Sequence, residues 1–181
     1  MPQPTLHTAR LTLRAYVPSD APALARLCND LDVVRWTASH PFPYELHHAQ
    51  EFIDQRQADF LAGKSTVFAG VRTTDAVLLG SAGLRREGDH QRAELGYMLG
   101  REHWRQGYAT EAAAGVLRYA FENLRLARVY ASAYAGNPAS IRVLEKLGFT
   151  REGVQRRHVL RLGEWHDVVL FGMLREEFTP R

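Results

Sequence analysis

A strand-to-helix turn in the middle of the chain has residue types that could bind an anion. The sequence ELGYMLG leads through REHW into RQGYATEA, where a helical pattern begins. Unpaired N–H groups converge at a helix N-terminus and the helix dipole is positive there, so an anion is stabilised. Gly107 would allow close approach of the backbone, and small Ala109 would leave the way open. Arg101 and Arg105 would add positive charge, although an ordinary turn that contains a glycine explains the same pattern.

A second strand-to-helix turn follows about thirty residues later. The strand-like AYAG runs into NPASIRVLEKLGF, which places Asn137 and Ser140 at a helix N-terminus. Asn137 is a typical N-cap, and Pro138 suits the first turn. The interpretation that competes with a functional one makes Asn137 only a cap and Ser140 only a polar residue of the first turn.

Other motifs with a known chemistry are missing or incomplete. Gly63, Lys64 and Ser65 match the end of a phosphate-binding P-loop, but Ala58 stands where its first glycine should be. The dinucleotide fingerprint G-x-G-x-x-G is absent. Cys28 is the only cysteine, which excludes an internal disulfide and a thiolate metal cluster. The eight histidines form no metal-ligand pattern, so we expect no metal.

Length and composition indicate one soluble domain, residues 1–181. Hydrophobic residues make up 45% and charged residues 24%, as in ordinary globular proteins. No apolar run approaches the length of a membrane span and no signal peptide is recognisable, so we expect a cytoplasmic protein without a membrane partner. Residues 85–161 carry 14 Lys and Arg against 8 Asp and Glu, which suits a polyanionic ligand such as a nucleotide cofactor or a mixed solvated surface. The sequence has no dense run of basic residues interleaved with aromatic residues, so we do not expect it to bind nucleic acid.

Hydrophobic periodicity predicts a mixed α/β layer around these turns. Alternation of polar and apolar residues predicts strands, and a spacing of three to four predicts helices. Leu24, Leu27 and Leu31 form the stripe of a first short helix after a strand at residues 10–16. The remaining expected elements are a helix at 45–61, an antiparallel meander at 66–71, 77–84 and 93–99, a helix at 110–124, a strand at 128–135, a helix from Asn137 to a stop at Gly148, and strands at 149–159 and 165–174.

The two turns in this order resemble the GCN5-related N-acetyltransferase (GNAT) superfamily. TARLTLRAYVPSDA is similar to the opening strand and helix of its ribosomal-protein alanine/serine N-terminal acetyltransferase (RimJ/RimL-like) branch. ELGYMLGREHWRQGYATEA resembles the cofactor segment, NPASIRVLEKLGF the last helix and GEWHDVVLFGMLREEF the final hairpin strand. The resemblance implies an α/β fold with a mixed, mostly antiparallel central sheet flanked by helices. It also implies acetyl-CoA as cosubstrate and no metal.

Two departures from the family pattern affect the implied site. The phosphate loop usually begins with Gln or Arg, but Trp104 stands there. The pyrophosphate would then be held by backbone amides alone, those of Arg105, Gln106, Gly107, Tyr108, Ala109 and Thr110. Many members carry a tyrosine general acid on the last helix, where this chain has Leu144. The resemblance places Ser140 near the cofactor sulfur instead, and Asn137 on the pantetheine arm.

The implied reaction moves an acetyl group from CoA to a primary amine. The amine must lose a proton before it attacks, and Glu94 is the candidate base, acting through water. The competing interpretation pairs Glu94 with an arginine such as Arg92 or Arg128. Backbone N–H groups of Tyr97, Met98 and Leu99 could polarise the thioester carbonyl.

The acceptor amine is expected to enter over the early helices and the final hairpin. Residues that could line its path, or could simply pack, are Trp36, His40, Phe42, Tyr44, Trp165 and His166. Three functions stay open: an acetyltransferase for protein N-termini such as those of ribosomal subunits, an acetyltransferase for small amines (a polyamine, amino acid or drug), and a non-catalytic acyl-CoA-binding module. A homodimer is common in the branch that the chain resembles.

Overall fold

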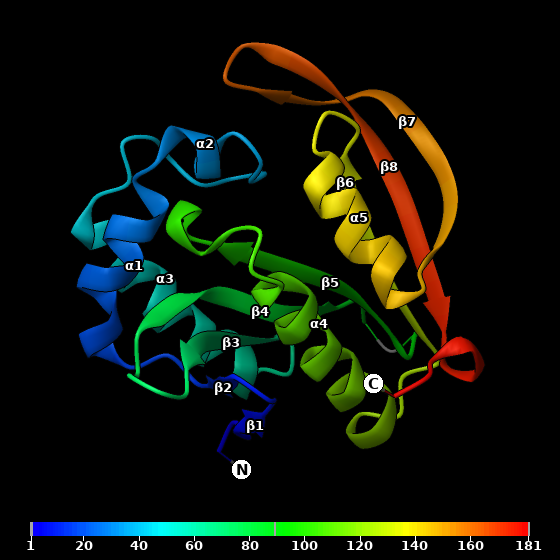
Figure 1. The fold of residues 1–181 in the computed structure, drawn as a ribbon, viewed down its shortest axis with the longest axis horizontal. Helices are drawn as coiled ribbons and strands as arrows, with labels where there is room; N and C mark the ends of the chain where they lie inside the picture. Colours follow the sequence, from blue (N-terminus) through cyan, green and yellow to red (C-terminus); the bar gives the residue numbers. More distant parts are fainter. Residues whose placement is uncertain (1, 89, 181) are drawn as a thin grey trace.

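An eight-stranded sheet runs through the molecule in the order β1-β2-β3-β4-β5-β6-β8-β7 (Figure 1). The computed structural model describes residues 2–88 and 90–180. Its strands are β1 (Leu6–His7), β2 (Leu11–Arg14), β3 (Ser65–Arg72), β4 (Leu78–Arg86), β5 (Arg92–Leu99), β6 (Arg128–Tyr134), β7 (Thr150–Arg161) and β8 (Glu164–Leu174). Its α-helices are α1 (Ala21–Cys28), α2 (Leu31–Val34), α3 (Leu46–Leu61), α4 (Tyr108–Arg118) and α5 (Pro138–Leu147). All neighbouring strands are antiparallel except β5 and β6, so the expected mixed, mostly antiparallel sheet is confirmed.

Helices cover both faces of the first five strands, which explains why β3 is buried along nearly its whole length. Phe68 packs in the larger core cluster with α4, whereas its neighbour Ala69 packs in the smaller cluster with α1 and α3. Successive side chains of a strand point to opposite faces, so one strand supplies both clusters. The stripe expected for the helix at 110–124 is buried in the larger cluster, with only Leu124 partly exposed.

Some element boundaries differ from the predictions for local reasons. The helix α4 begins at Tyr108 because Gly107 before it takes the left-handed conformation, with φ +82°. It changes to a π-helical turn over Tyr119–Asn123. The prediction for Leu31 was wrong: α1 ends at Cys28, Asp30 caps the separate short helix α2, and Leu31 is 42% exposed.

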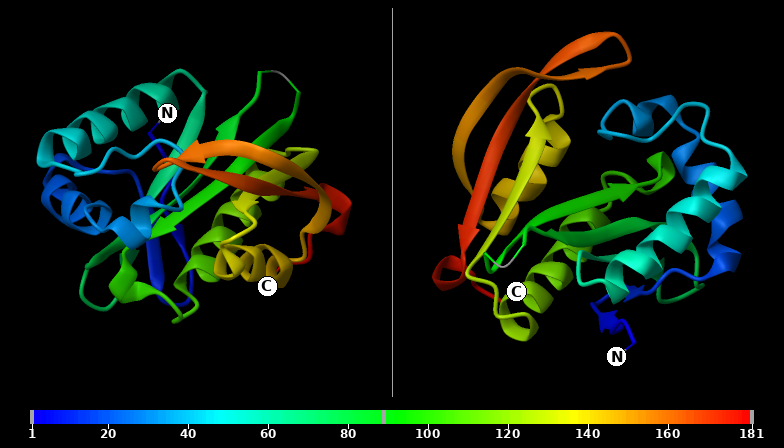
Figure 2. Two further views of the ribbon diagram at one scale, coloured as in Figure 1. Left: turned by 90° about the horizontal axis from the view of Figure 1, so that it is seen from above. Right: turned by 180° about the vertical axis from the view of Figure 1, so that it is seen from behind.

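Strands β5 and β6 share only a short ladder. They pair in parallel at Arg92–Arg128, Ala93–Val129 and Glu94–Tyr130, and among the described residues the pairing ends there. Beyond this point β5 continues on β4 as far as Leu99, while β6 continues on β8 as far as Tyr134. Residues 95–99 and 131–134, which we call the strand fork, therefore diverge (Figure 2). The sheet thus consists of an N-terminal arm, which is β1–β5 with α1–α3, and a C-terminal arm, which is β6–β8, and the two arms meet at three residue pairs.

The long β7–β8 hairpin ends near α2. Arg161 at the hairpin end donates hydrogen bonds from Nη2 to the carbonyl oxygens of Val34, at 3.1 Å, and His40, at 2.5 Å. The hairpin therefore contacts the N-terminal arm on the far side of the strand fork (Figure 1). Among the described residues, none of the helices combines the length and the apolar character that a membrane crossing would need.

Candidate active site at the strand fork

The predicted cofactor turn lies between β5 and α4, after a 3₁₀ turn at Arg101–His103. Arg105 and Gly107 both take left-handed backbone conformations, with φ +61° and +82°, and α4 starts at the next residue. Such turns orient successive N–H groups to one side and form an anion-binding concavity. Gln106, Arg105 and Gly107 are exposed, whereas Tyr108 is buried in the core. Ala109 and Thr110, the next residues of the helix, are half-buried. The first-turn amides of α4 thus lie at an exposed end of a well-anchored helix.

Arg10 supports this turn from the N-terminal segment, a role that the sequence did not reveal. Its Nη1 donates to the Gln106 carbonyl oxygen at 3.0 Å and its Nε to Glu111 Oε2 at 2.7 Å. The guanidinium also lies 4.4 Å from the centre of the Tyr108 ring. Burial works against ionisation of Glu111, but hydrogen bonds from Thr8 and Arg10 lower its pKa below the usual value. The ion pair between Arg10 and Glu111, which we call the Arg10–Glu111 clasp, therefore holds the turn against a segment about one hundred residues earlier in the sequence.

Trp104, the departure from the family's phosphate loop, has a structural contact. Its indole Nε1 donates to the Leu99 carbonyl oxygen at 2.9 Å and ties the turn to the end of β5. Arg101 is paired with Asp32 of α2, with 2.9 Å between Nη1 and Oδ2. No ion pair of Arg105 is found in the part of the chain that the structure describes, so this side chain is the more available cation at the turn.

Asn137 and Ser140 begin α5 on the β6 side of the strand fork. The Asn137 Oδ1 accepts from the Ser140 backbone N–H at 3.1 Å, so the predicted N-cap is confirmed, and Gly148 ends the helix with φ +92° as expected. The Asn137 side-chain amide keeps its NH₂ group for another partner. Ser140 Oγ lies 2.9 Å from the phenol oxygen of Tyr97 on β5. The structure thus brings together Tyr97, Asn137 and Ser140 from both sides of the fork.

Glu94 lies in the last residue pair of the β5–β6 ladder, where the fork begins. Its Oε2 accepts from Arg85 Nη2 at 2.5 Å, and its Oε1 is 3.5 Å from Ser132 Oγ on β6. An ion pair is present, as the competing interpretation expected, but with Arg85 and not with Arg92 or Arg128. Those two arginines pair with Glu87 and Glu152. Glu94 Oε1 is left with one weak contact and can accept a further hydrogen bond.

The expected acceptor residues separate into three groups. Trp36 and His166 join Tyr134 in one ring cluster: the Tyr134 and His166 rings stack with centres 5.1 Å apart, and Trp36 meets both edge-on. The Tyr134 hydroxyl is buried and has no hydrogen-bond partner among the described residues. This cluster joins the N-terminal arm, the end of β6 and the hairpin.

The other four expected residues are not part of this cluster. Tyr44 is a core residue, 4% exposed, and contacts His40, whose pKa is lowered by burial and by nearby Arg161. Phe42 and Trp165 are 47% and 57% exposed. Tyr134 was missed because it lies in an apolar strand run where nothing marks a tyrosine as part of a site.

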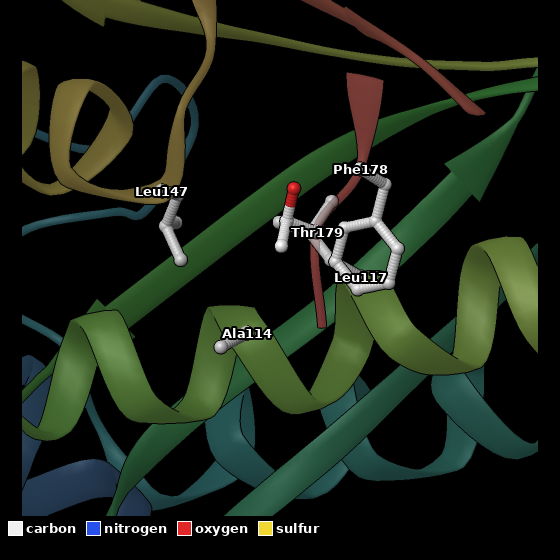
Figure 3. Close-up of a pocket in the computed structure, with 5 residues that line it drawn as sticks. All are labelled: Ala114, Leu117, Leu147, Phe178 and Thr179. Carbon is white, nitrogen blue, oxygen red and sulfur yellow. The ribbon is translucent and has the colours of Figure 1, made fainter. Parts of the chain in front are cut away.

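A small hollow elsewhere in the molecule does not belong to this site. It lies between α4, α5 and the C-terminal segment (Figure 3), and its lining residues are Ala114, Leu117, Leu147, Phe178 and Thr179. Since only one of them carries a hydroxyl and none is charged, it is a gap in apolar packing. Among the described residues, no three His, Cys, Asp or Glu side chains gather as a metal-binding group.

Comparison with known proteins identifies the family. Residues 10–150 match the family model described as an acetyltransferase (GNAT) domain. A Bacillus licheniformis protein named uncharacterized N-acetyltransferase p20 is 35% identical over 97% of this chain and 98% of its own length. The uS5-alanine N-acetyltransferase of Escherichia coli is 31% identical over 48% of this chain and 44% of its own.

Solved structures share the fold. Mycobacterium smegmatis RimJ in complex with CoA-disulfide superposes with a TM-score of 0.86, covering 96% of this chain and 88% of its own at 24% identity. This chain belongs to the GNAT acetyltransferase family and is an N-acetyltransferase.

Proposed function

We propose that this enzyme transfers the acetyl group of acetyl-CoA to the N-terminal α-amine of a protein. The observation that carries the proposal is the strand fork, which leads into the cofactor turn and has Glu94 at its base and Ser140 at its side. The relation to the uS5-alanine N-acetyltransferase supports a protein N-terminus as acceptor.

The residues present fit CoA. The backbone N–H groups of residues 105–110, at the turn and the start of α4, suit the pyrophosphate, and Arg105 adds charge. Alternate peptide groups of Tyr97, Met98 and Leu99 have no partner on β6. Apart from the Leu99 carbonyl oxygen, which accepts from Trp104 Nε1, they can bind the amides of the pantetheine arm, together with the Asn137 NH₂ group. Gly107 has no side chain that could block the cofactor, and a Cβ added there would lie 3.3 Å from Arg10 Nη2.

Acetyl-CoA supplies an acetyl thioester, and the chain supplies the groups that act around it. Glu94 accepts the proton of the acceptor amine through water, using Oε1, which only Ser132 contacts weakly. Backbone N–H groups of the strand fork polarise the carbonyl oxygen. Ser140 donates a hydrogen bond to the departing sulfur, assisted by the positive end of the α5 dipole. The Trp36–Tyr134–His166 cluster lies where the acceptor would enter.

Acetyl-CoA is expected to bind and to be consumed with N-terminal peptides. At a hundredfold excess over Kd, binding stabilises a protein by about 2.7 kcal/mol, a rise in melting temperature of about 5 °C or more for a chain of this size. Turnover should then be measured with peptides that begin with alanine or serine, with the same peptides N-acetylated as the matched control, and with a panel of polyamines and amino acids.

Each outcome of this experiment assigns a function. Turnover with free peptides and none with the acetylated ones supports the proposal. Faster turnover with polyamines or amino acids makes the enzyme a small-amine acetyltransferase. Binding without turnover on any amine leaves a non-catalytic acyl-CoA module, and absence of a thermal shift at millimolar acetyl-CoA contradicts cofactor binding at the turn.

Replacing Ser140 with alanine is expected to lower kcat at least ~10-fold and to leave affinity for acetyl-CoA nearly unchanged, because the lost hydrogen bond forms as the sulfur departs. The Asn137 cap uses the Ser140 backbone N–H, which alanine retains, so the melting temperature should barely change. Asn137→Ala is the matched variant: it removes the cap and should cost about 1 kcal/mol of stability. Normal turnover by Ser140→Ala would show that the thiolate leaves without this hydroxyl.

A further inference from the structure

The Ser140 hydroxyl has a partner across the strand fork. The phenol oxygen of Tyr97 lies 2.9 Å from Ser140 Oγ and 3.1 Å from the Ser140 carbonyl oxygen. These residues are 43 positions apart, so only the folded sheet brings them together. Leu144, at the position where many family members carry a tyrosine, is fully buried in the core. A tyrosine hydroxyl nevertheless contacts α5 in this protein, and it is that of Tyr97 on β5.

We propose that Tyr97 is a positioning residue that keeps the Ser140 hydroxyl available to the sulfur, an inference that rests on the proposed function. A serine in the first turns of a helix readily bonds a backbone carbonyl of the preceding turn. In that arrangement its proton is used within its own helix. The Tyr97 phenol competes with this bond because it offers Ser140 Oγ both a donor and an acceptor on the β5 side.

The hydrogen-bond geometry allows two arrangements of the same pair. A carbonyl oxygen only accepts, so in the first arrangement Tyr97 donates to the Ser140 carbonyl and the Ser140 hydroxyl donates to Tyr97. In the second, the phenol proton turns to Ser140 Oγ and frees the serine proton for another acceptor. Burial raises the pKa of Tyr97 to about 12, although the contact with Ser140 opposes the rise, so the phenol keeps its proton at neutral pH.

The second arrangement is the one that serves the reaction. As the amine nitrogen bonds to the acetyl carbon and the carbon–sulfur bond breaks, its electron pair goes to sulfur. Ser140 donates a hydrogen bond to this negative charge while Tyr97 donates to Ser140, and both residues keep their protons. The amine proton passes through Glu94 to water, and the thiolate takes up a proton from water. Atoms and charge therefore balance without ionising Tyr97.

Replacing Tyr97 with phenylalanine is expected to lower kcat roughly 10-fold, with little change in the KM for acetyl-CoA. The double variant Tyr97→Phe/Ser140→Ala should be no slower than Ser140→Ala alone, because a residue that acts through Ser140 has nothing left to position. Tyr119→Phe is the matched control. Tyr119, the residue after α4, also carries a buried phenol, which contacts Thr66 on β3, and Tyr119→Phe should keep wild-type kcat.

Ligand binding provides a readout that does not depend on turnover. CoA and desulfo-CoA differ only at the sulfur, and a growing share of the CoA thiol is ionised as the pH is raised above ~9. Wild-type protein should prefer CoA under these conditions. Tyr97→Phe should reduce that preference roughly 3- to 10-fold, the range expected for one hydrogen bond, whereas Tyr119→Phe should not change it.

The outcomes separate the two levels of the proposal. Wild-type protein that neither binds CoA nor consumes acetyl-CoA contradicts the proposed function itself. Wild-type turnover combined with normal kcat and a normal CoA preference in Tyr97→Phe overturns the role of Tyr97 only. Losses that multiply in the double variant would mean that Tyr97 acts independently of Ser140, and a lower melting temperature with intact kcat would mean a purely structural contact.

Discussion

The affinity for acetyl-CoA is expected to fall roughly 10- to 100-fold when valine replaces Gly107, because left-handed strain of order 1–3 kcal/mol must be restored each time the cofactor binds. Gly107 has φ +82°, a conformation that a β-branched residue rarely adopts. Valine can relieve the strain only by turning the backbone, and the N–H groups of residues 105–110 then no longer converge. Its side chain would also extend from a Cβ that lies 3.3 Å from Arg10 Nη2. Titration calorimetry with acetyl-CoA measures the effect.

Gly63 provides a matched control for backbone strain. It has φ +68° after α3, and a Cβ there would meet nothing within 4 Å. Gly63→Val should therefore lose stability, about 1–3 kcal/mol, and bind acetyl-CoA like the wild type. Unchanged affinity in a folded Gly107→Val protein would show that the turn is not the pyrophosphate site.

Replacing Glu94 with glutamine is expected to reduce kcat roughly 10- to 1000-fold at pH 6.5, because the variant keeps the shape of the side chain but accepts no proton. The defect should shrink as pH rises toward 9, since an α-amine with a pKa near 8 then loses its proton unaided. A pH profile of kcat for the wild type and the variant tests both parts.

Glu87 is the control for Glu94. It is a neighbouring carboxylate that accepts from Arg92 and from the Tyr130 hydroxyl and is not at the base of the fork. Glu87→Gln also disrupts an arginine pair, so any general effect of charge loss should occur in both variants, and only Glu94→Gln should show the pH-dependent defect. A wild-type rate for Glu94→Gln at pH 6.5 would show that Glu94 is not the base and that its role is limited to the ion pair with Arg85.

Features that depend on neighbouring residues could be predicted from the sequence. The cap at Asn137, the helix stops near Gly63 and at Gly148 and the meander of three strands follow from local chemistry and periodicity, and the structure has them all. The turn at Gly107 was also predicted, although α4 begins two residues earlier than its apolar stripe indicates.

Contacts that depend on strand register could not be predicted. Glu94 pairs with Arg85 because the β4–β5 register places these two residues directly opposite each other, and no pattern within β5 encodes that register. The same reason hides the contact of Tyr97 with Ser140. Alternation placed Tyr97 on a strand, but the element that its side chain faces is decided by how β5 and β6 diverge. The Arg10–Glu111 clasp is likewise invisible, since its residues are 101 positions apart.

Because only three residue pairs join β5 and β6, a small rotation at this ladder would produce a large displacement at the far end of the C-terminal arm. Between Gly172, which pairs with Tyr130 at the last rung, and Glu164 at the hairpin end, β8 extends roughly 26 Å at ~3.3 Å per residue. A rotation of about 5° at the ladder would move the hairpin end by about 2 Å over that length. The Tyr134–His166 stack and the Arg161 bonds to Val34 and His40 lie near the hairpin end. Substitutions at the hairpin end can therefore change the angle between the arms, and with it the width of the strand fork, without touching a reacting atom.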